Sequence, residues 1–317
     1  MMWHGFNKAE NKWNNHGISG HVYEIIDYFL LLHVHMNACI MLCEDIDWET
    51  FHRAIVTKYS LPENILEKIQ ANTIFHNRPR IVRGKNILFV DGGLKRGGGS
   101  KPPILIFKHI FCFRCSIYDT HHDLHYKNIT LLQDNRVYND GDSAIAIHYI
   151  KKINFAHYKK NEPCQTNTAM LYLTNNCRLL PEDEVRGIIE ENPHEQYMIL
   201  TTSPIAYSTR LRSLDNLLFP ELPVKDIFNR FDTYIYTRTR ADDRYDTRPF
   251  DCSPRFIVEC YHYGKNVVYH GIDDSYLADD TGLKYRLHDI KNDPDSLYLS
   301  ENDEIIDIIK QTINETI

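Results

Sequence analysis

The chain has 317 residues, of which 43% are hydrophobic and 25% charged, and its formal net charge is −7. This composition supplies apolar material for two medium-sized domains and excludes an intrinsically disordered chain. No apolar run approaches the roughly 20 residues that a membrane-spanning helix needs, so we expect no membrane partner.

The charge is divided unevenly along the chain. Residues 1–165 carry a net charge of +4 and 13 of the 17 histidines, whereas residues 166–317 carry −11. A basic half can bind a polyanion even in an acidic protein. The N-terminus lacks the pattern of a signal peptide, and most of the eight cysteines lie in apolar patterns. We therefore expect a cytoplasmic protein without a disulfide framework.

A glycine-containing loop opens the predicted fold. Residues 14–20 lead into a helix whose Val22, Ile25 and Phe29 keep helical spacing. Because such a loop can approach a ligand closely, its candidate ligand contacts are Gly17, Ser19, Gly20 and His21. A strand at 38–42 and helical segments at 51–59 and 62–70 follow. This alternation predicts an α/β unit with a parallel sheet.

Residues 78–108 are strongly basic and surround a predicted strand at 86–90. Against the single acid Asp91 stand Arg78, Arg80, Arg83, Lys85, Lys95, Arg96, Lys101 and Lys108. The glycine-rich loop 91–100 follows the carboxyl end of that strand, where α/β proteins usually bind ligands. We interpret the region as a contact for a nucleic-acid backbone. The alternative is an ordinary solvated surface loop.

The segment 109–128 contains possible metal ligands without a complete site. Cys112 and Cys115 form a C-x-x-C pair, and His121, His122 and His125 cluster nearby. No second pair or defined spacing completes a zinc site, so we expect no metal centre.

The next predicted strand, 128–132, ends close to Asp134. An acid at the carboxyl end of a parallel strand, with Arg136 two residues later, is a candidate general base. It can equally cap the following turn, and the sequence does not decide between the two.

A polar segment, 151–165, reads as a linker to a second α/β alternation. We expect strands at 170–173 and 197–200 and a helix at 182–191. Arg178 follows the first of these strands. In a parallel sheet it faces the same edge as the helix that begins near Ser253.

The helix near Ser253 is the strongest nucleotide candidate. It follows a buried strand at 233–237, and Ser253 with Pro254 forms a helix-start signal. The helical spacing of Phe256, Ile257, Cys260 and Tyr261 predicts a buried stripe, with Arg255 and Glu259 on the other side. A helix N-terminus attracts anions, Arg255 can hold a phosphate, and Glu259 can accept ribose hydroxyls. The alternative is an exposed ion pair four residues apart.

Two stretches resemble a known family. The run 85–102, KNILFVDGGLKRGGGSKP, and the run 126–137, YKNITLLQDNRV, resemble the strand, glycine loop and strand-Asp-x-Arg of the T-even phage DNA β-glucosyltransferase family. The resemblance implies an α/β GT-B fold, with two Rossmann-like domains facing across a cleft. We expect an acceptor domain at 1–165, a nucleotide-sugar domain at 166–300, and a C-terminal helix at 301–317 that can cross back.

The resemblance also implies an activity and site residues. Asp134 matches the catalytic aspartate, Arg178 and Arg255 match phosphate-binding arginines, and Glu259 matches the ribose-binding glutamate. The expected enzyme transfers a sugar from a UDP-sugar to 5-hydroxymethylcytosine in double-stranded DNA by inverting displacement. We expect a monomer in the cytoplasm of an infected bacterial cell.

The resemblance leaves the sugar open. The loop 16–21, where we place the sugar, departs from the family pattern, so both glucose and arabinose remain. No metal is obligatory, although Mg²⁺ or Mn²⁺ can assist. The DNA contacts are assigned to Arg78, Arg80, Arg83, Lys95, Arg96, Lys101 and Arg136. The alternatives are a GT-B enzyme acting on a lipid or polysaccharide, and a non-catalytic nucleotide-binding or nucleic-acid-binding module.

Overall fold

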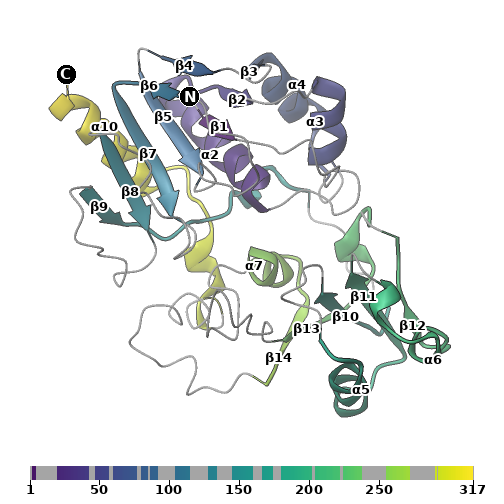
Figure 1. The fold of residues 1–317 in the computed structure, drawn as a ribbon. Helices are drawn as coiled ribbons and strands as arrows, with labels where there is room; N and C mark the ends of the chain where they lie inside the picture. Colours follow the sequence, from purple (N-terminus) through teal and green to yellow (C-terminus); the bar gives the residue numbers. More distant parts are fainter. Residues whose placement is uncertain are drawn as a thin grey trace.

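The structure is a computed structural model of the chain. It describes residues 2–4, 20–42, 47–56, 60–76, 80–84, 86–91, 104–114, 128–133, 145–159, 166–173, 180–201, 204–221, 224–237, 255–271, 290 and 292–316. Within these residues the chain is a mixed α/β protein with parallel sheets (Figure 1). No helix among them is long and apolar enough to cross a membrane.

The first sheet has seven strands in the order β3-β2-β1-β5-β7-β8-β9, and all neighbours are parallel. Its strands are β1 (Met2–His4), β2 (Ile40–Leu42), β3 (Thr73–Phe75), β5 (Ile87–Asp91), β7 (His109–Arg114), β8 (Ile129–Gln133) and β9 (Ile145–His148). The order reverses between β1 and β5, as it does in doubly wound nucleotide-binding folds.

Different elements cover the two faces of the first sheet. Phe89, Phe111 and Leu132 share a core with helix α2 (Gly20–Met36), which also takes in residues of α3 (Trp48–Ile55) and α4 (Glu63–Ala71). Leu88 and Ile110 point the other way, because successive side chains of a strand alternate between faces. They pack against a two-stranded ribbon, β4 (Ile81–Arg83) with β6 (Ile104–Ile106).

The second sheet has five parallel strands in the order β12-β11-β10-β13-β14. Its strands are β10 (Thr168–Leu173), β11 (Gln196–Thr201), β12 (Leu217–Leu218), β13 (Thr233–Thr237) and β14 (Asn266–His270). Its helices are α5 (Glu182–Glu191), α6 (Thr209–Arg212) and α7 (Arg255–His262). The described part of the chain also has short 3₁₀ helices, which are η4 (Phe155–His157), η6 (Pro204–Ala206), η7 (Ile227–Asn229) and η8 (Pro294–Leu297). This order also reverses, between β10 and β13.

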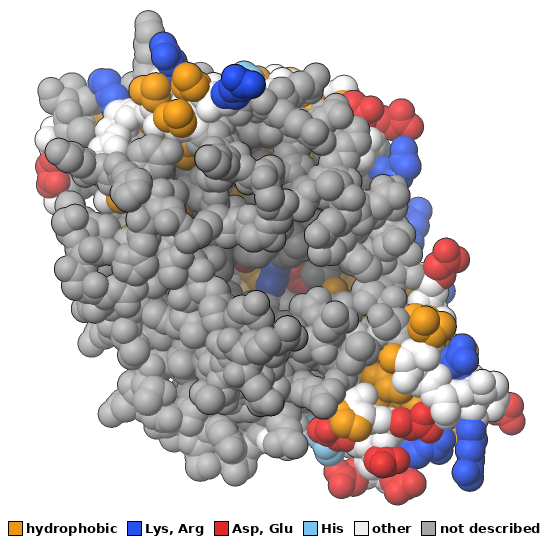
Figure 2. All heavy atoms as spheres, viewed as in Figure 1, with side chains coloured by type: hydrophobic (Ala, Val, Ile, Leu, Met, Phe, Trp, Pro, Cys, Tyr) orange, Lys and Arg blue, Asp and Glu red, His pale blue; other side chains and the backbone are white. Residues whose placement is uncertain are grey.

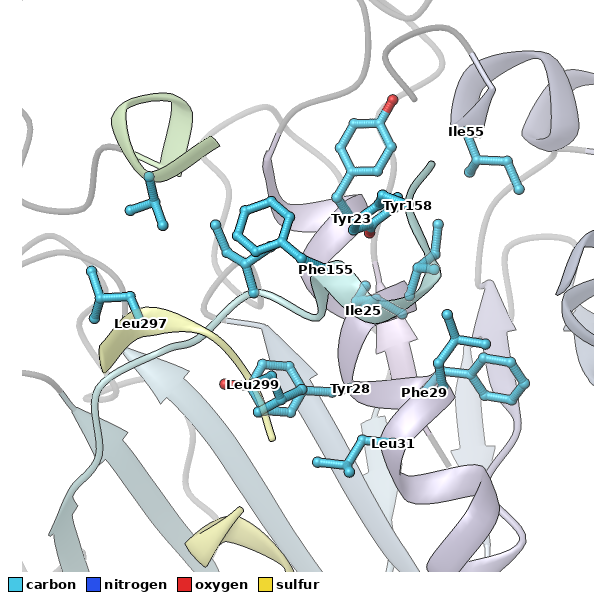
Figure 3. Close-up of a cluster of buried hydrophobic side chains, with 14 of the residues drawn as sticks. Tyr23, Ile25, Tyr28, Phe29, Leu31, Ile55, Phe155, Tyr158, Leu297 and Leu299 are labelled. Carbon is cyan, nitrogen blue, oxygen red and sulfur yellow. The ribbon is translucent and has the colours of Figure 1, made fainter. Parts of the chain in front are cut away.

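One core joins the two sheets. It contains residues of α2 and the first sheet, Phe155 and Tyr158, and also Ile257 and Val258 of α7. Figure 1 shows α7 between the sheets, and Figure 3 shows Phe155 and Tyr158 against α2. The described part of the expected polar linker, 151–159, is therefore largely buried.

The C-terminal helix, α10 (Glu304–Thr316), is tied to the first sheet's side of this core. Ile305, Ile306 and Ile309 are buried as predicted, and Ile313 is partly buried. Asp303, just before the helix, accepts hydrogen bonds from the Tyr149 hydroxyl at 2.9 Å and the Ile305 N–H at 3.1 Å. Its other carboxylate oxygen pairs with Lys152 Nζ at 2.7 Å. This carboxylate therefore anchors the start of the helix.

We expect Asp303→Ala to lower the unfolding free energy by about 1–3 kcal/mol, because it leaves buried donors without their acceptor. Urea unfolding measures the loss. Asp307→Ala, at an exposed position of the same helix, is the matched control and is expected to change stability by less than about 0.5 kcal/mol. Equal effects for the two variants would contradict the anchoring role.

Candidate functional site

The two reversal points predict where a ligand binds. In open parallel sheets, ligands bind beyond the carboxyl ends of the strands that flank the reversal. Here those strands are β1, β5, β10 and β13. The segments that follow them are 5–19, 92–103, 174–179 and 238–254, and all four lie outside the described residues.

Most of the predicted site residues fall in the part of the chain that is not described. These are Gly17, Ser19, Arg78, Lys95, Arg96, Lys101, Asp134, Arg136, Arg178 and Ser253. β8 ends at Gln133, the residue before Asp134. Gly20 begins α2 and His21 lies in its first turn.

Arg255 and Glu259 lie at the contact between the two sheets. Arg255 Nε donates to Glu259 Oε1 at 2.6 Å, and its Nη1 donates to Asp27 Oδ2 at 2.7 Å. Arg255 is 6% exposed, and Glu259 and Asp27 are 0% exposed. Asp27 comes from α2, so this ion pair joins α7 to the helix that covers the first sheet.

The predicted faces of this helix are wrong in part. Ile257 and Cys260 are buried as expected, but Arg255 and Glu259 are buried as well, and Phe256 and Tyr261 only partly. The expected ion pair four residues apart forms, but in the interior. The reason is that α7 packs on its own sheet and also meets α2 and η8, so more than one face is covered.

Asp27 is a buried acid with neutral and cationic partners. The Tyr158 hydroxyl donates to its Oδ1 at 2.5 Å, and Arg255 holds its Oδ2. Burial raises the pKa of Asp27 from 3.8 to about 6, against the opposing effects of Arg255 and the Tyr158 hydrogen bond. The same helix carries a second buried pair, Glu24 with Lys151 at 2.6 Å.

The raised pKa gives a pH dependence that can be measured. A carboxyl whose pKa is higher in the folded state favours folding most at low pH, and this contribution is lost as pH rises through about 6. Relative to Asp27→Asn, we expect the wild type to lose about 2 kcal/mol of unfolding free energy between about pH 4 and pH 6. Urea unfolding across this range tests it, and parallel pH profiles for the two proteins would contradict it.

Three cations of the basic region are described, Arg80, Arg83 and Lys108, and the two that were assigned to DNA, Arg80 and Arg83, lie near the amino ends of the strands of the first sheet. Arg83 belongs to β4 and Arg80 directly precedes it, and both are exposed. β4 leads into the amino end of β5, as β6 leads into β7. The structure therefore does not bring Arg80 and Arg83 together with the carboxyl ends of the strands.

Asp27 and Tyr158 are the site residues that sequence reasoning missed. A usable signal exists, since Glu24 and Asp27 interrupt a helix in which every residue from 23 to 32 is buried. Acids are seldom fully buried unless they are paired, so two of them in an apolar helix predict partners elsewhere in the chain.

In Figure 2, a few basic and acidic side chains of described residues are visible at mid-height of the molecule. Among the described residues, no group of three or more His, Cys, Asp or Glu side chains is arranged to hold a metal ion.

Comparisons with protein-family models, curated proteins and solved structures found no match for this chain.

Proposed function

We propose that the chain is a UDP-sugar-dependent glycosyltransferase of GT-B architecture. Its substrate would be 5-hydroxymethylcytosine in double-stranded DNA, and the sugar glucose or arabinose. The observation that carries the proposal is the pair of parallel sheets, each with a strand-order reversal, with Arg255 of α7 at the contact between them. A strand-order reversal in a parallel sheet is the usual place for a nucleotide to bind, so two such sheets in contact support the proposal.

In the proposed reaction, the hydroxyl oxygen of the hydroxymethyl group attacks the anomeric carbon of the sugar. Asp134 takes the proton of this hydroxyl as the new bond forms. The bond from that carbon to the diphosphate oxygen breaks, and its electron pair leaves with UDP. Arg178, Ser253, Arg255 and the N-terminus of α7 would stabilise the developing negative charge. A single displacement of this kind inverts the anomeric centre.

The acceptor has to leave the duplex before it can react. Flipping a base out of the stack costs a few kcal/mol, which contacts to the DNA backbone can offset. Lys95, Arg96 and Lys101 follow β5 and Arg136 follows β8, so these cations are our main candidates for the backbone contacts. Arg80 and Arg83 lie near the amino ends of the strands, so they would contact only DNA that extends to that end of the sheet.

Mass spectrometry of hydroxymethylcytosine-containing DNA, incubated with a panel of UDP-sugars, tests the proposal. We expect the mass of one hexose or one pentose on the modified base. Unmodified cytosine DNA is the matched control and is expected to gain nothing. Two results together would contradict DNA as the acceptor. These are sugar transfer to a lipid or polysaccharide, and the lack of DNA binding that weakens steeply with salt.

A further inference from the structure

The contacts of Arg255 raise a question about how a diphosphate reaches it. Two carboxylates touch its guanidinium, and only 6% of the residue is exposed. With both acids ionised, the three side chains together carry one net negative charge. A diphosphate therefore gains little from Arg255 while Asp27 stays in place.

The two carboxylates differ in how they are attached. Glu259 lies four residues after Arg255 on α7, so that pair moves as one unit with the helix. Asp27 belongs to α2, 228 residues away in sequence, on the other side of the contact between the sheets. Only the pair with Asp27 can therefore be exchanged by a movement of α7 relative to α2.

We propose that the Asp27–Arg255 ion pair is a latch, which the diphosphate of the donor opens by displacing Asp27 from the guanidinium. The inference rests on the proposed role of Arg255 in donor binding. It adds that donor binding is coupled to a loosened contact between α2 and α7. Because breaking the Asp27–Arg255 ion pair costs free energy, the latch lowers the apparent affinity for the donor.

The surroundings of Asp27 make its release feasible. After release, Asp27 keeps the hydrogen bond from Tyr158, whose segment packs on α2. Because burial already holds the pKa of Asp27 at about 6, proton uptake can neutralise the carboxyl once Arg255 leaves. Among the described residues, Arg255, Tyr158 and Glu24 are the charged and titratable groups with the largest effects on the pKa of Asp27.

Calorimetric titration with UDP tests the latch in the full-length protein. Asp27→Asn removes the competing charge and is expected to tighten UDP binding by about 5-fold to 150-fold, the usual range of coupling between sites. Glu24→Gln is the matched control, because it removes a buried acid from the same helix that pairs with Lys151. It is expected to leave UDP affinity unchanged.

The outcomes separate the latch from the proposed function. UDP binding that is equal or weaker in Asp27→Asn would overturn the latch and leave the function standing. No UDP binding by any of the three proteins would overturn both.

If Asp27→Asn fails to fold, amide hydrogen exchange in the wild type tests the latch without a variant. Saturating UDP is expected to speed amide exchange in α2 around Asp27, with α5 unchanged as the internal control. Unchanged or slower exchange in α2 would overturn the latch.

Discussion

Arg255→Ala is expected to lower the unfolding free energy by about 3–5 kcal/mol, the usual effect of breaking a buried ion pair from one side. The variant leaves Asp27 and Glu259, both 0% exposed, without the cation that touches them. It also removes the guanidinium from the Tyr23 ring, whose centre lies 5.7 Å away. Urea unfolding near neutral pH measures the loss.

A matched control distinguishes burial from the mere presence of an ion pair. Arg53 and Glu49 on α3 form another pair four residues apart, with side chains 69% and 84% exposed. Arg53→Ala is expected to cost no more than about 0.5 kcal/mol, because water already solvates both charges. Similar losses in the two variants would show that the network around Arg255 adds nothing through burial.

Asp134→Asn is expected to slow sugar transfer by about 10²-fold to 10⁴-fold, the usual contribution of a positioned general base. An amide of the same shape cannot take the proton of the attacking hydroxyl. UDP affinity is expected to be unchanged, because the proposed donor contacts lie on other residues. Single-turnover transfer to hydroxymethylcytosine DNA measures the rate, and a rate near that of the wild type would remove Asp134 as the base.

Local patterns predicted much of the secondary structure. The expected helix at 182–191 and strand at 233–237 match α5 and β13, and Gly264, with a φ of 66°, follows the end of α7 as expected. These elements carry a clear periodicity or a turn residue, so local sequence suffices. The short strands β4 and β6 were missed, because three residues give too little periodicity to detect.

β7 was missed for a different reason. Its six residues, HIFCFR, form a nearly continuous apolar run, which is typical of a strand buried on both faces. The C-x-x-C pair and the histidines that follow resemble metal ligands, and this obscures the strand pattern. In the structure Cys112 is a buried residue of this strand, and its Sγ donates to the Phe113 carbonyl oxygen.

The contacts of the candidate site could not be predicted from local sequence. The Arg255–Glu259 pair follows from helical spacing, but the Arg255–Asp27 pair depends on how α7 packs against α2. The segment 151–159 shows the same limit. Its lysines suggested a polar linker, yet Lys151 and Lys152 find partners in Glu24 and Asp303, which allows the segment to be buried.

The central claim is that the planar guanidinium of Arg255 holds the diphosphate of a nucleotide donor. Calorimetric titration of UDP into the wild type and Arg255→Lys tests it most directly, because lysine keeps the charge and loses the two-pronged hydrogen bonding. We expect the wild type to bind UDP and Arg255→Lys to bind it at least about tenfold more weakly, a difference of about 1.4 kcal/mol. A wild type that does not bind UDP, or equal affinities in the two proteins, would contradict it.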